Sequence, residues 1–421
     1  MTSLHENCSE CTLGQLDLFK LPCTQLSIEK TQYTEYFPIA SLRQGSTIEF
    51  SISGDGDFYL NLSETLVYAQ VKITEEDGSE LKTPEQVKTT PLLLSSLFSQ
   101  IDVFFNGKLV SSASDTYAYR AYFETLLNYG HSAKMSQLSA ALFQSDQITS
   151  AALKKPFDLI GRLHSDVFLQ KKFLLNHVDV KLRFVPNDSK FCLQIVGEDD
   201  TLKPKLEIVN MFLFIKRMKP TPQILAAHAN VLDSGVSAKY DYRRTQVRVH
   251  AIPAGSKAAH IDSVFHGQLP VRIVIGLVEH VAFSGEYKTS PFQFDHHKLS
   301  TLSLTADGEE VYGKPLQPDF ENNNYIRSYF TLFTGTGSEF RDTGNAISRK
   351  DYINGNTLYV FDLTPDSGAD CASHVNLIHQ GSVRLEIKFA KTTTKPINVV
   401  VYGEFESLLQ IDKYRNVTLD F

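Results

Sequence analysis

The sequence predicts an all-β protein built from two tandem antiparallel sandwiches, and three observations lead to that prediction. Short segments in which apolar and polar residues alternate recur along the 421 residues. Gly, Asn and Asp turns separate them, and helical periodicity is scarce. Several motifs of the first half return in the same order about 200 residues later. Strands that bury one face in this way favour a sandwich in each half of the chain.

Two segments near the N-terminus show the alternation most clearly. Residues 47–52 place Ile48, Phe50 and Ile52 on one face, and residues 67–73 do the same with Val67, Ala69, Val71 and Ile73. Side chains two apart on a strand share a face, so we expect both sets to be buried.

A predicted hairpin followed by a helix is the most distinctive unit, at residues 97–130. The apolar run 101–105 leads into Asn106 and Gly107, which favour a type I′ turn because both of its central residues have positive φ. The helix should begin after Asp115 and end before Gly130. Its single apolar face is formed by residues three or four apart: Ala118, Tyr122, Leu126 and Tyr129.

The second half of the chain repeats this unit. Asp307 and Gly308 form the same kind of turn, and Tyr329-Phe330 corresponds to Tyr122-Phe123 at an offset of 207. We expect these four aromatic residues to serve in packing and the four turn residues to close the hairpins. The other matches, with offsets of 200 to 207, are residues 90–91 with 290–291, FYLNL (58–62) with FHGQL (265–269), FDL (157–159) with FDL (361–363), and VDVKLRF (178–184) with VRLEIKF (383–389).

The repeat divides the chain into three predicted parts. Residues 1–15 form a flexible N-terminal arm, 16–220 a first sandwich and 221–421 a second. The boundary falls at residues 219–222, where two prolines in KPTP stop strand pairing and a short helix is expected at 223–231. An eight-stranded sandwich of about 200 residues with one Ser/Ala-rich helical excursion (131–155) suggests a jelly roll, although periodicity alone also fits other Greek keys.

Composition excludes several classes of protein. Hydrophobic content of 42% and charged content of 21% are typical of globular domains. A net charge of −7 argues against a dedicated nucleic-acid binder. The first residues contain no apolar core of a signal peptide, no stretch is long enough to span a membrane, and the five irregularly spaced cysteines favour a reducing compartment.

Motifs that carry chemistry are weak. Cys8-x-x-Cys11 has half the spacing of a zinc site, but unpaired thiols in a tail are the favoured interpretation. The second half holds nine histidines without a His-x-His pair, and His296-His297 would point to opposite faces of a strand. No nucleophile elbow or catalytic constellation is evident, so we expect no catalytic residue, metal or cofactor. The Tyr-rich segments YAYRAYF (117–123) and YIRSYF (325–330) fit interface anchors and sandwich caps equally well.

The segment SSLFSQIDVFFNGKLVSSASDTYAYRAYFETLLNYG (95–130) closely resembles the signature region of double jelly-roll major capsid proteins. The most similar group is that of Polinton (Maverick) elements and adintoviruses, with virophage and adenovirus hexon-type proteins more distant. In the second half GQLPVRIVIGLV (267–278), SPFQFDHHKL (290–299), FDLTPD (361–366) and the closing YGEFESLLQIDKYRNV also resemble this group.

This resemblance implies two eight-stranded jelly rolls standing side by side and a non-enzymatic, structural role. Three chains would form a homotrimer with a pseudo-hexagonal outline, and these capsomers would pack laterally into the icosahedral capsid of a double-stranded DNA virus or virus-like transposon. The implied partners are further copies of the chain and a penton or minor capsid protein, without specific nucleic-acid or membrane binding. Assembly inside the host cell, in nucleus or cytoplasm, and a place in the virion capsid follow from the same resemblance.

Two other functions remain as alternatives. Paired jelly rolls also occur in copper monooxygenases, which would require histidines such as His296 to converge on a metal. A carbohydrate-binding jelly roll is the third possibility.

Overall fold

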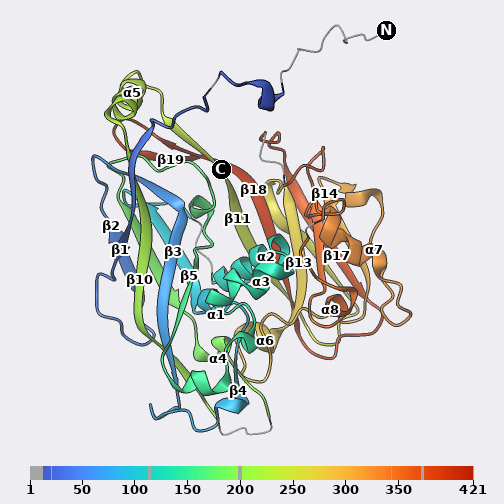
Figure 1. Ribbon diagram of the computed structural model, residues 1–421. Helices are drawn as coiled ribbons and strands as arrows, with labels where there is room; N and C mark the ends of the chain where they lie inside the picture. The colour runs from blue at the N-terminus through green and yellow to red at the C-terminus, as the bar shows by residue number, and fades with distance from the viewer. Residues whose placement is uncertain are drawn as a thin grey trace, which may run out of the picture.

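The computed structural model describes residues 13–19, 21–111, 115–197, 202–342, 344–370 and 374–420. Within these residues the strands form two sandwiches that stand side by side, one from each half of the chain (Figure 1). The predicted arm lies largely outside the described residues. Its described end includes the short 3-10 turn η1 (Gly14–Leu16).

The first sandwich contains eight principal strands in two four-stranded sheets. One sheet has the order β1-β10-β3-β7 and the other β2-β8-β5-β6, and all the pairings are antiparallel. The bounds are β1 (Ile28–Tyr36), β2 (Ile48–Ile52), β3 (Tyr59–Thr74), β5 (Phe98–Phe105), β6 (Lys108–Leu109), β7 (Phe157–Arg162), β8 (Val180–Pro186) and β10 (Lys205–Pro220).

The second sandwich contains eight principal strands as well. Its sheets have the orders β11-β18-β13-β16 and β12-β17-β14-β15. The bounds are β11 (Ala238–Ile252), β12 (Ala258–Gln268), β13 (Arg272–Glu279), β14 (Leu299–Ala306), β15 (Glu309–Glu310), β16 (Leu358–Asp362), β17 (Gln380–Phe389) and β18 (Ile397–Ile411).

Both sandwiches have the same strand order. When the eight strands of each are counted along the chain, one sheet reads 1-8-3-6 and the other 2-7-4-5 in both halves. This is jelly-roll topology, so the predicted fold class, two tandem eight-stranded antiparallel jelly rolls, is confirmed. The choice among Greek keys is thereby decided, because the four sheets show which strands are neighbours. We refer to the two sandwiches as the first and the second roll.

The remaining elements are short and lie mainly between or beyond the strands of the rolls. The additional strands are β4 (Val87–Thr89), β9 (Leu193–Ile195) and β19 (Val417–Asp420). The α-helices are α1 (Leu93–Ser96), α2 (Tyr117–Asn128), α3 (His131–Met135), α4 (Ser189–Cys192), α5 (Pro222–Asp233), α6 (His280–Ser284), α7 (Ile326–Thr334) and α8 (Arg349–Ile353). The other 3-10 turns are η2 (Pro84–Gln86), η3 (Gln137–Ala141), η4 (Ser145–Gln147), η5 (Ser150–Lys154), η6 (Asp166–Phe168) and η7 (Val311–Gly313).

The link between the rolls consists of strand, turn and helix. β10 ends at Pro220, and α5 begins at Pro222, where a proline at the first helical position costs no hydrogen bond. α5 lies at the same end of the molecule as β19 (Figure 1).

Alternation of side chains explains which faces the strands bury. Ile48, Phe50 and Ile52 of β2 are buried, as the sequence predicts. The four predicted positions of β3, Val67, Ala69, Val71 and Ile73, are buried too. β13 differs because nearly all of its residues are buried. Its residues Ile273 and Ile275 face the core of the second roll, whereas Val274 and Val278 join the core that includes the first roll. The sheet that contains β13 is therefore covered on both faces.

The strand ladders correct three of the sequence matches. Val180 pairs with Phe105, and Val383 pairs with Ala306 at the equivalent place, so β8 and β17 are related by 203 residues rather than 205. The shift is even, so it leaves the buried face unchanged. Phe157 opens β7 whereas Phe361 is the fourth residue of β16, so the FDL match falls at different points of the sixth strand in the two rolls. FYLNL runs into the third strand of its roll and FHGQL ends the second, so this match is wrong.

The helix predicted after the hairpin forms, but with different ends and surroundings. α2 has Thr116 rather than Asp115 at its N-cap and Tyr129 at its C-cap. All eleven residues from Tyr117 to Leu127 are buried, so the helix has no solvent face. The prediction of a single apolar face is wrong because α2 lies between the two rolls (Figure 1), where Arg120 and Glu124 find charged partners.

No helix among the described residues is both long and apolar enough to cross a membrane.

Candidate functional site

Aromatic side chains of α2 attach the first roll to the second. Tyr122 stacks on Phe292 with ring centroids 4.2 Å apart, and Tyr119 stacks on Phe283 of α6 at 4.9 Å. Phe123 contacts Phe294 at 5.1 Å. Offset and edge-on aromatic contacts of this kind stabilise beyond the area that they bury. The interface between the rolls is therefore a continuation of the apolar core rather than a hinge.

The ring of Phe294 lies close to the backbone of strand β13. Phe294 lies over Gly276 of β13, where an added Cβ would come within 2.6 Å of the Phe294 ring and 2.8 Å of Leu358. Phe294 also forms backbone hydrogen bonds with Gly355 and Thr357. A residue without a side chain at position 276 therefore lets the ring reach the sheet.

Charged side chains of α2 form a buried network beside the aromatic cluster. Nε of Arg120 lies 2.8 Å from Oε1 of Glu124, and Nη1 of Arg120 lies 2.6 Å from Oδ1 of Asp166. Nδ1 of His164 lies 2.7 Å from Oε2 of Glu124. All four side chains are less than a tenth exposed, so the charges rely on one another rather than on water.

The network extends into the second roll. The Tyr402 hydroxyl of β18 lies 3.4 Å from Glu124 and 3.0 Å from Glu404. The backbone N–H of Thr245 in β11 donates to Asp166 at 3.0 Å. Arg272 lies 3.4 Å from Glu404 and donates to the carbonyl of Gly335 at 2.9 Å. Hydrogen bonds thus run from α2 across the sheet β11-β18-β13-β16.

The pKa values of the network follow from burial and pairing. Burial alone would raise the pKa of Glu124, but Arg120 and His164 outweigh it and lower this pKa to about 2. Burial opposes the charge of Arg120, yet Asp166 and Glu124 keep its pKa above the ordinary value. Burial raises the pKa of Tyr117, whose hydroxyl accepts a hydrogen bond from His164 N–H, to about 12. Glu124 and Arg120 are therefore a stable ion pair at neutral pH.

The space around this network is too small for a substrate. The cavity beside Arg120 and His164 has a volume of about 20 Å³ and is lined also by Thr116, Tyr117 and Thr245. Such a volume suits a single water molecule. The arrangement can hold the two rolls in register, but it offers no room for an organic ligand.

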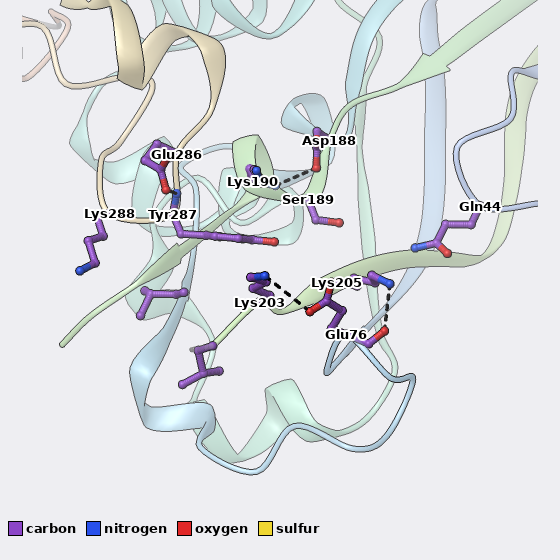
Figure 2. Close-up of a pocket in the computed structure, with 12 residues that line it drawn as sticks. Gln44, Glu76, Asp188, Ser189, Lys190, Lys203, Lys205, Glu286, Tyr287 and Lys288 are labelled. Atoms are coloured by element: carbon purple, nitrogen blue, oxygen red, sulfur yellow. Dashed lines mark hydrogen bonds and ion pairs between the residues drawn. The ribbon is translucent and has the colours of Figure 1, made fainter. Parts of the chain in front are cut away.

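A larger, open pocket of about 620 Å³ lies beside α4 (Figure 2). Lys190, Lys203, Lys205 and Lys288 line it together with Glu76, Asp188 and Glu286. Tyr287 of the second roll extends across it, accepts a hydrogen bond from Ile195 N–H through its carbonyl (2.7 Å) and donates its hydroxyl to Pro204 (2.9 Å). Lys203 lies 3.9 Å from the carboxylate of Glu76, and Lys205 donates to the backbone carbonyl of Glu76 at 2.9 Å. Residues of both rolls line this pocket, so it is a second place where the two rolls meet.

The histidines do not gather in one place in the described parts of the chain. His296 stacks on Phe320 at 4.1 Å, His228 bonds the Tyr59 hydroxyl at 2.9 Å, and His280 bonds Asn398 at 3.2 Å. Burial lowers the pKa of His296 and of His297. No group of three or more His, Cys, Asp or Glu side chains that could hold a metal occurs among the described residues. Cys8 and Cys11 lie outside those residues.

The four turn residues occupy equivalent places in the two rolls. Asn106 and Gly107 join β5 to β6 with φ values of 48° and 80°. Asp307 and Gly308 join β14 to β15 with φ values of 49° and 87°. Asn106 also accepts from Asp179 N–H and donates to the carbonyl of Arg415, at 2.8 Å each. Both turns have the positive φ values of a type I′ hairpin.

The four aromatic residues differ between the rolls. Tyr122 and Phe123 are buried against the second roll. Tyr329 of α7 is half-buried, donates to the carbonyl of Ile347 at 2.8 Å and contacts Tyr352. Phe330 is 46% exposed. Its ring contacts Phe333 at 6.0 Å, so among the described residues Phe330 packs only in part.

Sequence reasoning missed the partners of α2. Asp166, His164, Phe294 and Tyr402 come from segments 40 to about 280 residues distant from Glu124 or Phe123. One signal was present, since Arg120 and Glu124 stand at i and i+4 within a run of aromatic residues, which suits a buried ion pair.

Known proteins share the fold over the whole chain. No family model matches the sequence. An uncharacterized protein of Caenorhabditis elegans is 26% identical over 95% of this chain and 99% of its own length. A chain in the structure of the Sputnik virophage matches 100% of this chain and 94% of its own, at a TM-score of 0.63 and 12% identity.

Two further structures are similar. A chain of the PBCV-1 virus capsid has a TM-score of 0.61 and 11% identity, and covers 96% of this chain and 99% of its own. The Faustovirus major capsid protein has a TM-score of 0.56 and 10% identity, and covers 93% of this chain and 92% of its own. The chain thus has a double jelly-roll fold similar to chains of these viral structures.

Proposed function

We propose that this chain is a non-enzymatic major capsid protein that forms homotrimers. The observation that carries the proposal is the exact repetition of one strand order in two rolls that share a buried interface. Three such chains supply six similar bodies, so a threefold ring has a nearly sixfold outline, which can pack laterally into a closed shell. The similarity to chains of the PBCV-1 capsid and to the Faustovirus major capsid protein supports this use of the fold.

Exposed apolar side chains support self-association. Monomeric proteins rarely expose extended apolar patches. Here the first described residues expose Leu18 to 77%, Phe19 to 96% and Leu21 to 92%, and Phe340 is 94% exposed. Contacts with further copies of the chain would cover such residues, and a penton or minor capsid protein is a further partner in this proposal.

A virus-like transposon of the Polinton (Maverick) or adintovirus type is the proposed genetic setting. The relative of nearly equal length occurs in an animal, Caenorhabditis elegans, which favours an element resident in animal genomes. The capsid would enclose double-stranded DNA and assemble inside the host cell.

Light scattering coupled to size exclusion tests the oligomeric state. We expect a particle of three chains, each of 47.3 kDa, with little monomer at micromolar concentration. A monomer at high concentration would contradict the proposal. The histidine positions described above do not favour the copper-enzyme alternative, and no observation on the described residues favours carbohydrate binding, so we propose neither.

A further inference from the structure

Both rolls have an apolar outer sheet face, but the residues that the structure describes cover only one of these faces. In the second roll, Val274 pairs with Tyr402 and Gly276 with Val400 on the outward side of the sheet β11-β18-β13-β16. α2 and Phe294 of the same chain cover this side through their contacts with Tyr402 and Gly276. The sheet β1-β10-β3-β7 of the first roll has an equivalent outward side, which we call the first outer face.

The first outer face is rich in aromatic residues. Tyr68 pairs with Phe212 and Leu66 with Phe214, so all four side chains point outward from β3 and β10. The rings of Tyr68 and Phe212 stack at 4.3 Å, and Phe37, which is 60% exposed, packs on Phe212 at 5.7 Å. Tyr68, Phe212 and Phe214 remain partly accessible. An apolar sheet face of this kind is typical of an interface.

α7 is the counterpart of α2 in the second roll. Each helix follows the short hairpin between the fourth and fifth strands, and an offset of 207 residues relates them. The offset matches the buried Ala121 and Thr125 of α2 with Ser328 and Leu332 of α7, which are buried too. The two helices therefore present equivalent faces to their own rolls.

The outward faces of the two helices carry similar residues, but they differ in how far they are covered. Tyr119 and Phe123 of α2 are buried against the second roll. The matching residues of α7, Ile326 and Phe330, are 40% and 46% exposed. Arg327, which matches the buried Arg120, is exposed as well.

We propose that α7 of one chain docks on the first outer face of a second copy of this chain, as α2 docks on the second roll within one chain. Phe330 and Ile326 contact the aromatic residues of that face. Arg327, whose guanidinium group donates to the carbonyls of Lys314 and Pro315, adds a positive charge near Glu35, which is exposed on β1 beside Tyr33. The contact is head-to-tail, and repeating it through three chains closes a ring in which all six interfaces between rolls are alike. This inference rests on the proposed capsid function and names the surfaces that build its capsomer.

Cross-linking tests which surfaces meet. The double variant Phe330→Cys/Phe212→Cys is made in a background where Cys8, Cys11, Cys23 and Cys371 are serine and the buried Cys192 is retained. A short bis-maleimide should convert it into covalent dimers and trimers on a denaturing gel. The control Tyr414→Cys/Phe212→Cys, with Tyr414 75% exposed on the C-terminal turn, should stay as single chains.

A charge introduced on α7 tests whether the contact is needed. Phe330→Asp changes an exposed side chain, so the chain should fold with an unchanged circular dichroism spectrum and thermal midpoint. Light scattering should then show the mass of one chain. The matched variant Tyr414→Asp should keep the mass of the wild type.

The outcomes separate this inference from the proposed function. A trimeric wild type whose Phe330→Asp variant remains trimeric, without cross-linking between positions 330 and 212, overturns the α7 contact and leaves the capsid function standing. Cross-linking of Leu18→Cys to Phe212→Cys within single chains also overturns it, because the chain's own N-terminal segment would then cover the face. A monomeric wild type overturns both proposals.

Discussion

Nζ of Lys134 donates a hydrogen bond of 2.6 Å to the backbone carbonyl of Asn345, and this contact joins the helical excursion of the first roll to the second roll. The same ammonium group donates to the carbonyl of Leu126 in the last turn of α2 at 2.9 Å and lies 5.6 Å from the centre of the Phe143 ring. A cation at a helix C-terminus is favourable, but Lys134 has almost no contact with water. Lys134 thus joins the two rolls, although burying its ammonium group costs the free energy of its hydration.

Replacing Lys134 with methionine should change how stability depends on alkaline pH. Burial lowers the pKa of Lys134 from 10.5 to about 8, so between these values the unfolded chain holds more protons than the folded chain. The contribution of this lysine to the unfolding free energy therefore rises with pH across the window, by up to about 3 kcal/mol. Urea unfolding at pH 7.5, 9 and 10 measures this effect. The unfolding free energy of the wild type should rise with pH relative to that of Lys134→Met.

The exposed Lys350 supplies the control. Lys350→Met should show a difference from the wild type that is flat over the same pH range. A flat difference for Lys134→Met would mean that its ammonium group is hydrated.

Replacing Glu124 with glutamine should lower the unfolding free energy, and the loss should be larger at neutral pH than in acid. The pKa of Glu124 is lowered from 4.5 to about 2, so its charge contributes stability above pH 4.5 that is lost as the pH falls through this window. The variant also leaves Arg120 and His164 with a neutral partner, which we expect to cost about 3 kcal/mol at pH 7. Denaturant unfolding should show a smaller difference in unfolding free energy between wild type and Glu124→Gln at pH 3 than at pH 7.

Glu321, whose carboxylate is exposed and pairs with Lys298 and Lys391, gives the matched control. Its glutamine variant should unfold as the wild type does at pH 7. Equal effects of the two variants would argue against a special role of the buried network.

Replacing Gly276 with alanine should strain the interface between the rolls. The new Cβ would lie 2.6 Å from Phe294 and 2.8 Å from Leu358, both of which are fully buried. Overpacking of this kind typically costs about 1–3 kcal/mol. Gly344→Ala, where the nearest atoms are 3.8 Å away or farther, should be close to neutral in the same thermal unfolding experiment. Equal midpoints for the two variants would show that the sheet and Phe294 separate readily.

The paired hairpins should respond alike to alanine. Gly107 and Gly308 have φ values of 80° and 87°, and nothing lies within 4 Å of a Cβ at either position. Backbone strain alone should therefore lower the unfolding free energy in both Gly107→Ala and Gly308→Ala, by about 1 kcal/mol each. Denaturant titration of both variants checks this, and a several-fold difference between them would contradict equivalent turns.

Local patterns in the sequence predict much of the fold. Positive φ at Asn106-Gly107 and Asp307-Gly308 and alternation in β2 and β3 are local properties, so they are visible without the structure. The covering of the outer sheet face of the second roll depends on residues that are far apart in the sequence. α2 contains Arg120 and Glu124, so its sequence resembles a surface helix, and only the distant Asp166 and His164 make its polar side burial possible.

The errors in the repeat have a similar cause. Aromatic-aliphatic motifs such as FDL are common in strands, and motif letters do not show which strand of a jelly roll they occupy. Phe157 and Phe361 therefore match in letters but lie at different points of the sixth strand. Phe330, which is expected to pack, contacts Phe333 but stays about half exposed among the described residues.

Negative-stain class averages of the purified, cross-linker-free protein test the central claim most directly. The account predicts particles with threefold symmetry, a hexagonal outline and six lobes of similar size. Particles with two lobes, or rings with any other number of chains than three, would contradict it.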